Sequence, residues 1–237
     1  MKKTKLMLLM LIVFTITGCT IDYNLTINSD KQVEETTKII NSNEMILLHN
    51  ESVNLFLTEQ INTHKQIDIF RRYVFGKHLG KDSSYISIKR TYGTLKDYIT
   101  SPTFNHLFEN ATITETEEYV SFQTTGEYYY NNVYGEQSEP DFYVGDINIQ
   151  IRFHNKIIDS NADEIDEKSN TLKWKITDKN LEKSIYFKVS NEKRYDIIVI
   201  DYIMKNQSTI IISLSILVVI MIISLYVYVN FRKNNTI

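Results

Sequence analysis

Residues 20–28 read Thr-Ile-Asp-Tyr-Asn-Leu-Thr-Ile-Asn, and this stretch indicates the fold class of the domain that follows it. Apolar and polar side chains alternate along it, which is the pattern of a strand with one buried face. Residues 28–31 have the composition of a turn, and alternation then resumes through Val33, Glu35, Thr37 and Ile39. The two runs therefore predict a β-hairpin.

The rest of the chain mixes helical and strand periods. The pattern changes at residue 42 and predicts a helix to about residue 62, while 67–80 is ambiguous. Short helices are predicted on either side of Pro102, over 94–101 and 103–108. Further strands are predicted over 85–92, 119–125, 146–154, 172–177 and 184–189. This order predicts an α+β fold with a mostly antiparallel sheet and a few helices on one side, plus one C-terminal transmembrane helix.

The first 19 residues have the layout of a bacterial lipoprotein signal peptide. Lysines precede an apolar run from Leu6 to Ile16, and Ile16-Thr17-Gly18-Cys19 closes it as a lipobox. An uncleaved anchor is disfavoured because a run of about 11 residues reaches only about half of a ~30 Å hydrocarbon core. Cleavage before Cys19 is predicted, and the resemblance to lipoprotein signals implies that the Cys19 thiol is diacylated, with palmitate as a typical chain. Since Cys19 is the only cysteine, the fold has no internal disulfide.

A second membrane element is predicted near the C-terminus. Residues 210–229 carry no charge, and at about 1.5 Å per residue they match the ~30 Å hydrocarbon core. Arg232 and Lys233 follow this segment, which places the C-terminus in the cytoplasm. A sortase signal would also end in an apolar segment and a basic tail, but residues 194–208 contain no Leu-Pro-X-Thr-Gly-like motif. A permanent transmembrane anchor is therefore favoured.

These segments divide the chain into a signal peptide at 1–18, one extracytoplasmic α+β domain at 19–205, a transmembrane helix at 206–231 and a short basic cytoplasmic tail at 232–237. Five of the 26 basic residues and none of the 29 acidic residues lie in the membrane segments, so the exported part holds 21 against 29, a net charge of about −8. That balance argues against nucleic-acid binding. The expected location is the cell membrane, lipid-anchored and single-pass, and the Asn, Ile and Lys content favours a Gram-positive bacterium.

Motifs of catalysis are absent from the sequence. The five histidines lie far apart, and no Gly-x-Ser-x-Gly, phosphate loop or His-Glu-x-x-His occurs. Acidic residues at 159–167 offer oxygen ligands for calcium, but they lack EF-hand spacing, and Asn161, Asp163 and Asn170 favour turn chemistry. We therefore expect no enzyme activity, no metal site and no cofactor; a hydrolase with dispersed Ser, His and Asp residues is the enzymatic alternative.

Aromatic side chains gather in the turn-rich stretch 126–145. Tyrosines offer a large apolar area together with a hydroxyl, and they are favoured in recognition surfaces. The same residues could instead form an edge strand with alternate rings packed inward, so both interpretations stay open. The candidate binding surface comprises Tyr128, Tyr129, Tyr130, Tyr134 and Tyr143.

Three short motifs carry a family resemblance. They are Asp22-Tyr23-Asn24-Leu25-Thr26-Ile27-Asn28, the run from Asn155 to Asp163, and Asn170-Thr171-Leu172-Lys173-Trp174. They resemble the LppM-type domain of bacterial lipoproteins. In that family a strand hairpin follows the acylated cysteine, a Ser-Asn-Ala turn precedes a strand bearing a tryptophan, and a C-terminal transmembrane helix ends the chain. The tyrosine-rich middle departs from this pattern.

The resemblance implies an envelope lipoprotein with a non-catalytic domain that binds a lipid, glycolipid or other hydrophobic ligand. The alternative is a protein-protein interaction or accessory subunit of an envelope membrane complex, docked through the tyrosine-rich surface. Lipid binding predicts an apolar cavity inside the domain, whereas docking predicts a filled core and an exposed aromatic patch. Trp174, the only tryptophan, is expected in the core in either case.

Overall fold

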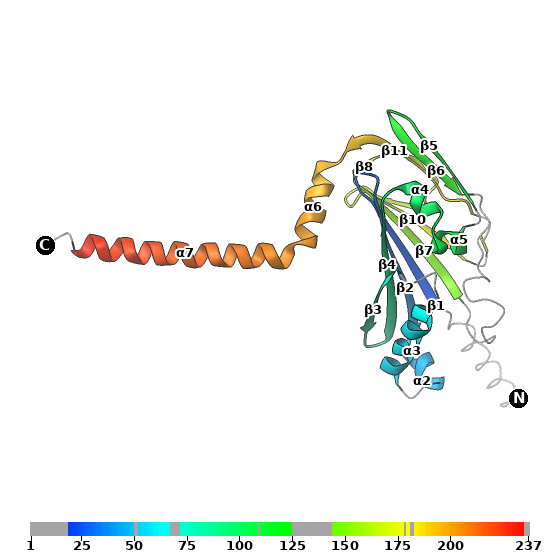
Figure 1. Cartoon of the computed structure of the whole chain (residues 1–237), viewed down its shortest axis with the longest axis horizontal. Helices are drawn as coiled ribbons and strands as arrows, with labels where there is room; N and C mark the ends of the chain where they lie inside the picture. The colour runs from blue at the N-terminus through cyan, green and yellow to red at the C-terminus, as the bar shows by residue number, and fades with distance from the viewer. Residues whose placement is uncertain are drawn as a thin grey trace, which may run out of the picture. The chain divides into compact units, whose positions relative to one another are not determined.

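The chain divides into two compact units, Met1–Lys193 and Arg194–Ile237 (Figure 1). The first unit contains the strands, and the described part of the second is helical. The α+β class expected from the sequence is confirmed, but two mostly antiparallel sheets replace the expected single sheet. The computed structural model describes residues 19–49, 52–66, 72–108, 110–124, 144–177, 179–180 and 183–234.

The larger sheet has seven strands, and the first strand of the chain lies at its centre. The strands in spatial order are β3 (Val74–Leu79), β4 (Ser83–Tyr92), β2 (Val33–Ser42), β1 (Cys19–Ile27), β7 (Val144–Phe153), β10 (Thr171–Ile176) and β9 (Glu164–Asp166). Only the pair β1–β7 of this sheet is parallel. The predicted hairpin of β1 and β2 is confirmed, since Ile21 pairs with Ile39 and Ile27 with Val33.

A smaller sheet packs over the apolar face of β1, β7 and β10. Its order is β5 (Ala111–Glu115), β6 (Tyr119–Thr124), β11 (Tyr186–Lys193) and β8 (Asn155–Ser160). Phe122 and Phe187 of this sheet stack with ring centroids 4.9 Å apart, and Phe187 meets Phe153 of β7 edge-on at 4.8 Å. These rings join the two sheets into one apolar core.

Within the described residues, four helices accompany the sheets: α2 (Asn43–His49), α3 (Val53–Gln66), α4 (Leu95–Ile99) and α5 (Pro102–Leu107). The single helix expected over 42–62 is two helices, because Ser52 starts a new one by accepting the amide of Phe56 at 3.0 Å. Pro102 begins α5 rather than separating two helices, since its missing N–H costs nothing there and Ser101 caps the amide of Phe104. Leu57 of α3 completes a second core cluster with Ile39, Ile86 and Ile88.

The second unit contains α6 (Tyr195–Lys205) and α7 (Gln207–Asn234). Within the described residues, Gln207–Val227 is long and apolar enough to cross a membrane, with a mean hydropathy of 3.0 and no buried side chain in the window. The segment coincides with the predicted transmembrane helix. A long helix that leaves so much apolar surface uncovered fits a lipid environment better than water.

Candidate functional site

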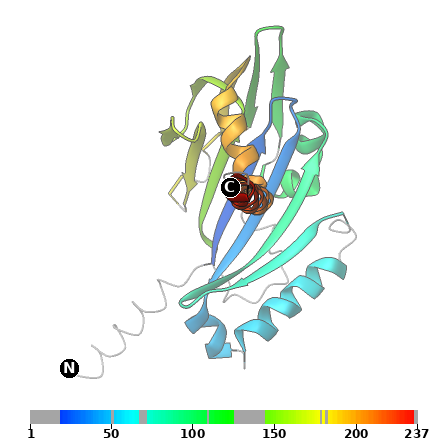
Figure 2. The same ribbon diagram turned by 90° about the vertical axis from the view of Figure 1, so that its left-hand side faces the viewer.

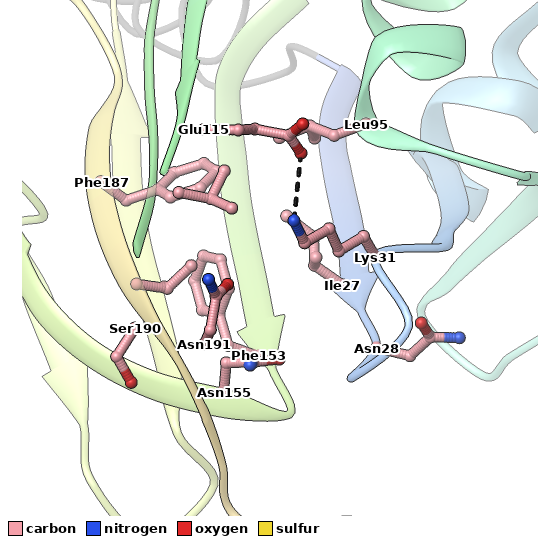
Figure 3. Close-up of a pocket in the computed structure, with 12 residues that line it drawn as sticks. Ile27, Asn28, Lys31, Leu95, Glu115, Phe153, Asn155, Phe187, Ser190 and Asn191 are labelled. Carbon is pink, nitrogen blue, oxygen red and sulfur yellow. Dashed lines mark hydrogen bonds and ion pairs between the residues drawn. The ribbon is translucent and has the colours of Figure 1, made fainter. Parts of the chain in front are cut away.

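An apolar pocket lies between the two sheets, at the end of the domain where the β1–β2 turn is found (Figure 3). Its walls combine side chains of both sheets and of α4: Ile27, Leu95, Val120, Phe153, Phe187 and Val189. A polar rim surrounds them: Asn28, Lys31, Glu115, Asn155, Ser190 and Asn191. We call this the inter-sheet pocket. Apolar walls below a polar rim form a site suited to an amphiphilic molecule.

The inter-sheet pocket is nearly closed. Its cavity measures about 20 Å³, and a deeper one of about 10 Å³ shares Ile27, Leu95 and Phe187 with it. Such volumes hold about one water molecule, whereas sites for small organic ligands span roughly 300–1,000 Å³. Of the two expectations from the sequence, this packing is nearer to the filled core than to a ready lipid cavity. A ligand of that size does not fit the pocket in this conformation.

The β1–β2 turn places Lys31 at the rim. Asn28 organises this turn: its side-chain oxygen accepts the amides of Asp30 at 3.0 Å and Gln32 at 2.9 Å, and its carbonyl accepts the amide of Lys31 at 3.0 Å. These bonds hold Lys31 at φ 64°, a left-handed conformation that few residues other than glycine adopt. The turn predicted at residues 28–31 is thus confirmed, and its conformation fixes the position of one rim cation.

Glu115 at the end of β5 is the acidic partner across the rim. Its carboxylate lies 3.4 Å from Lys31 Nζ (Figure 3). It also lies 3.8 Å from Lys96 Nζ. Both ion pairs are partly exposed, and such pairs contribute about 1 kcal/mol or less. The ion pairs across the rim of the pocket are therefore weak contacts.

The polar rim lies close to the point where the chain leaves the first unit. Ser190 and Asn191 belong to β11, which ends at Lys193. Lys193 Nζ lies 3.4 Å from Asp30 in the β1–β2 turn, so the end of this strand and the turn are neighbours. The pocket mouth is thus only a few residues from the segment that leads into the apolar helix α7.

Behind the inter-sheet pocket, a buried carboxylate anchors a group of tyrosines. Glu35 is 2% exposed and accepts 2.6 Å hydrogen bonds from the hydroxyls of Tyr23 and Tyr92. The Tyr23 hydroxyl is also 2.7 Å from the Tyr98 hydroxyl, and the Tyr92 hydroxyl is 2.9 Å from the Tyr73 hydroxyl. The rings of Tyr23 and Tyr98 line the deeper cavity, so the apolar interior ends on this tyrosine–glutamate cluster.

Burial controls the ionisation of the tyrosine–glutamate cluster. Desolvation raises the pKa of Glu35 above its usual value, although the hydrogen bonds from Tyr23 and Tyr92 and the charge of Arg90 oppose the rise. Desolvation and the neighbouring Glu35 raise the pKa values of Tyr23 and Tyr98, which keeps both phenols protonated as donors. The sequence contained one signal of this cluster, because Glu35 stands among apolar residues on the inward face of the predicted strand.

The motifs that resemble the LppM family have structural roles here. Trp174 is 1% exposed, which confirms the expected core position, and its Nε1 donates to Asn161 Oδ1 at 2.9 Å. The same oxygen accepts the amide of Tyr186 at 2.8 Å and so links the two sheets. Asn170, at φ 52°, donates from Nδ2 to the carbonyls of Phe153 at 2.7 Å and Asn155 at 2.8 Å. These asparagines shape turns, as the sequence predicted.

Other predicted site residues contribute less to this geometry. Cys19 is the first residue of β1, and its side chain lies outside the described residues. Tyr128, Tyr129, Tyr130, Tyr134 and Tyr143 all lie outside the described residues, so the candidate binding surface stays a prediction. In the acidic loop, Asp166 accepts the amides of Lys168 and Ser169 as a turn residue, and Asp163 pairs with Lys183. The described residues contain no group of three or more His, Cys, Asp or Glu suited to a metal ion.

Comparisons with known proteins find a similarity to a solved structure. No family model matches the chain, and no curated protein matches it. Among solved structures, the chain is similar to the NMR structure of the Mycobacterium tuberculosis LppM protein folded domain, with 10% sequence identity and a TM-score of 0.45. The match covers 76% of this chain and 94% of that chain. LppM is the family that the sequence motifs resemble.

Proposed function

We propose that this protein is a membrane-anchored envelope lipoprotein whose extracytoplasmic domain binds an amphiphilic ligand, a lipid or glycolipid, in the inter-sheet pocket and performs no catalysis. The observation that best supports this proposal is the pocket itself, which has apolar walls and a charged rim at its mouth. Two residues of the rim, Ser190 and Asn191, precede by only a few positions in the chain the segment that continues into α7. A ligand with an acyl chain and a polar head group matches both parts.

Membrane attachment is supported from both ends of the sequence. The lipobox ending at Cys19 directs acylation and export, and α7 offers a 21-residue apolar segment of mean hydropathy 3.0. A diacyl group together with a transmembrane helix exceeds what stable retention needs. The domain would then stay beside a leaflet that supplies amphiphiles continuously.

The energetics of entry favour a pocket that opens around its ligand. Separating Lys31 from Glu115 costs about 1 kcal/mol or less, whereas each methylene buried from water contributes about 0.8 kcal/mol. A few methylenes between Phe153 and Phe187 therefore offset the rim contact, and longer chains are needed to offset the loss of packing between the sheets. An anionic head group would replace Glu115 as the partner of Lys31.

Native mass spectrometry of the full chain, purified gently from a membrane-containing host, tests this function. We expect an adduct with the mass of an amphiphile, lost in Lys31→Glu but retained in Lys96→Glu. The second variant is a matched control because Lys96 also faces Glu115 but does not line the pocket. A bare protein mass under conditions that retain lipid on a known lipid carrier would refute ligand binding.

Protein docking is the second candidate, and the nearly closed core is the observation that favours it. In this case the domain is an accessory subunit of an envelope complex and recognises its partner through the tyrosine-rich surface. Mild crosslinking followed by purification would then recover one specific protein without bound lipid. Replacing Tyr129 and Tyr134 together by serine is expected to abolish that recovery and to leave the amphiphile adduct of the first candidate unchanged.

A further inference from the structure

Three leucines lie uncovered on the helices α2 and α3. Leu47 is 54% exposed, Leu48 63% and Leu55 51%. On α2, Ile46 is buried at 4% exposure, whereas Leu47 and Leu48 are exposed. One face of this helix is therefore packed against the domain, and another presents apolar side chains to the outside. Adjacent exposed leucines cost free energy in water, and such groups commonly mark a surface that contacts an apolar partner.

Strand pairing places these helices at the start of β1. Thr20 pairs with Ile40, and α2 follows directly on β2 at Asn43. Asn43 fixes the beginning of α2 by donating from Nδ2 to the carbonyls of Gly80 at 2.9 Å and Lys81 at 3.1 Å. Figures 1 and 2 agree that α2 and α3 lie beside the end of β1 where that strand begins.

This end of the domain is also the end that the apolar N-terminal segment joins. The run from Leu6 to Ile16 stops three residues before Cys19, the first residue of β1. With that run cleaved and Cys19 acylated, as in the proposed function, the chain carries a membrane-embedded group at this point. The opposite end of β1, marked by the contact of Asp30 with Lys193, lies about 26 Å away at ~3.3 Å per strand residue.

We propose that Leu47, Leu48 and Leu55 form a contact with the lipid surface that holds the Cys19 end of the domain against the outer leaflet. The proposal relies on the membrane attachment of the proposed function but not on ligand binding in the inter-sheet pocket, which lies at the other end of β1. The leucines give this contact its apolar area. The contact is therefore apolar and depends little on anionic lipid or salt.

A fluorescence experiment on the full mature chain in phosphatidylcholine vesicles tests the contact. An environment-sensitive label at Leu48→Cys reports lipid proximity, because acylated Cys19 leaves the new cysteine as the only free thiol. The matched control is Ile158→Cys, which replaces an apolar residue of 50% exposure on β8. Brominated lipids should quench the label at position 48 at least three times more than at position 158, and raising the salt should not change this ratio.

Equal quenching at the two sites, or none at position 48, would overturn the proposal. The double variant Leu47→Ser/Leu55→Ser, with the label at position 48, provides a second readout. We expect it to lose most of the quenching without a change in thermal midpoint, since both leucines are exposed. Retained quenching in this variant would contradict the assigned surface. The amphiphile adduct in the mass spectrum is expected to be unaffected, which separates this contact from the function of the inter-sheet pocket.

Discussion

Replacing Tyr23 by phenylalanine removes a single oxygen from the centre of the tyrosine–glutamate cluster. That hydroxyl donates to Glu35 Oε1 at 2.6 Å and lies 2.7 Å from the hydroxyl of Tyr98. The ring itself remains, so the packing of β1 against the smaller sheet is kept. The variant isolates the polar contribution of the cluster from its apolar contribution.

The expected cost of Tyr23→Phe follows from the two lost contacts. A hydrogen bond contributes about 1 kcal/mol between neutral groups and about 1.5–3 kcal/mol to a charged one, so the two lost contacts cost about 2 kcal/mol when Glu35 is protonated and about 2.5–4 kcal/mol when it is ionised. The bond from Tyr23 lowers the pKa of Glu35, and without it the pKa rises further. A higher folded-state pKa means that the loss of stability continues to a higher pH and is larger in total. The destabilisation by Tyr23→Phe should therefore be smaller at pH 4 than at pH 8.

Trp174 fluorescence during urea unfolding of the full chain in mild detergent measures this cost. The probe is well placed because Trp174 is the only tryptophan and is buried in the core. Tyr85→Phe is the control, since its ring stacks on His78 and its hydroxyl has no hydrogen-bond partner within the part of the chain that the structure describes. A loss below 0.5 kcal/mol for Tyr23→Phe at pH 8, or equal losses at both pH values, would refute this account of the cluster.

Three further changes test other parts of the fold. Glu35→Gln should flatten the pH dependence of stability. Because the folded-state pKa of Glu35 is raised, its contribution to stability is fully present below its usual pKa near 4.5 and is lost as the pH rises through the folded-state pKa. Urea unfolding midpoints measured from pH 4 to 8 would show the difference. Asn161→Ala should destabilise by about 2–3 kcal/mol, because Trp174 Nε1 and a backbone amide lose their shared acceptor; an unchanged melting temperature would contradict this role. Asn170→Asp should destabilise more than Asn170→Gly in the same melting assay: both lose the bonds to the carbonyls of Phe153 and Asn155, but aspartate also leaves a buried carboxylate facing these two oxygens, whereas glycine adopts the left-handed backbone freely.

Local pattern predicted the elements of this fold better than their arrangement. The hairpin of β1 and β2 followed from alternation and a turn signal, and two short helices were predicted on either side of Pro102. Strand β5 gave no signal, because Ile113 is the only large apolar residue in Ala-Thr-Ile-Thr-Glu. The division into two sheets was also missed, since alternation describes one strand and does not name its partner.

The candidate site depended even more on tertiary structure. Lys31 and Glu115 are 84 positions apart and meet only because the smaller sheet folds over the β1–β2 turn. The sequence analysis favoured the tyrosine-rich stretch instead, because composition reveals residues that are clustered along the chain but not residues that meet only after folding. Glu35 could have been noticed as a carboxylate on an inward face, but its two tyrosine partners come from separate strands, Tyr23 from β1 and Tyr92 from β4.

Because β1 lies at the centre of its sheet, its two neighbouring strands are synthesised at different times. Its antiparallel partner β2 follows within a few residues, but its parallel partner β7 is synthesised much later. Asn148 of β7 donates a 2.9 Å hydrogen bond to Asp22 of β1, and these two residues are 126 positions apart in the chain. At about 5–20 residues per second of synthesis, the second edge of β1 waits roughly 6–25 s for this partner. An open strand edge readily pairs with a wrong chain during such an interval. We expect closure of β1 on β7 to be the slow step of folding, and a chaperone that covers this edge to raise the yield of native protein.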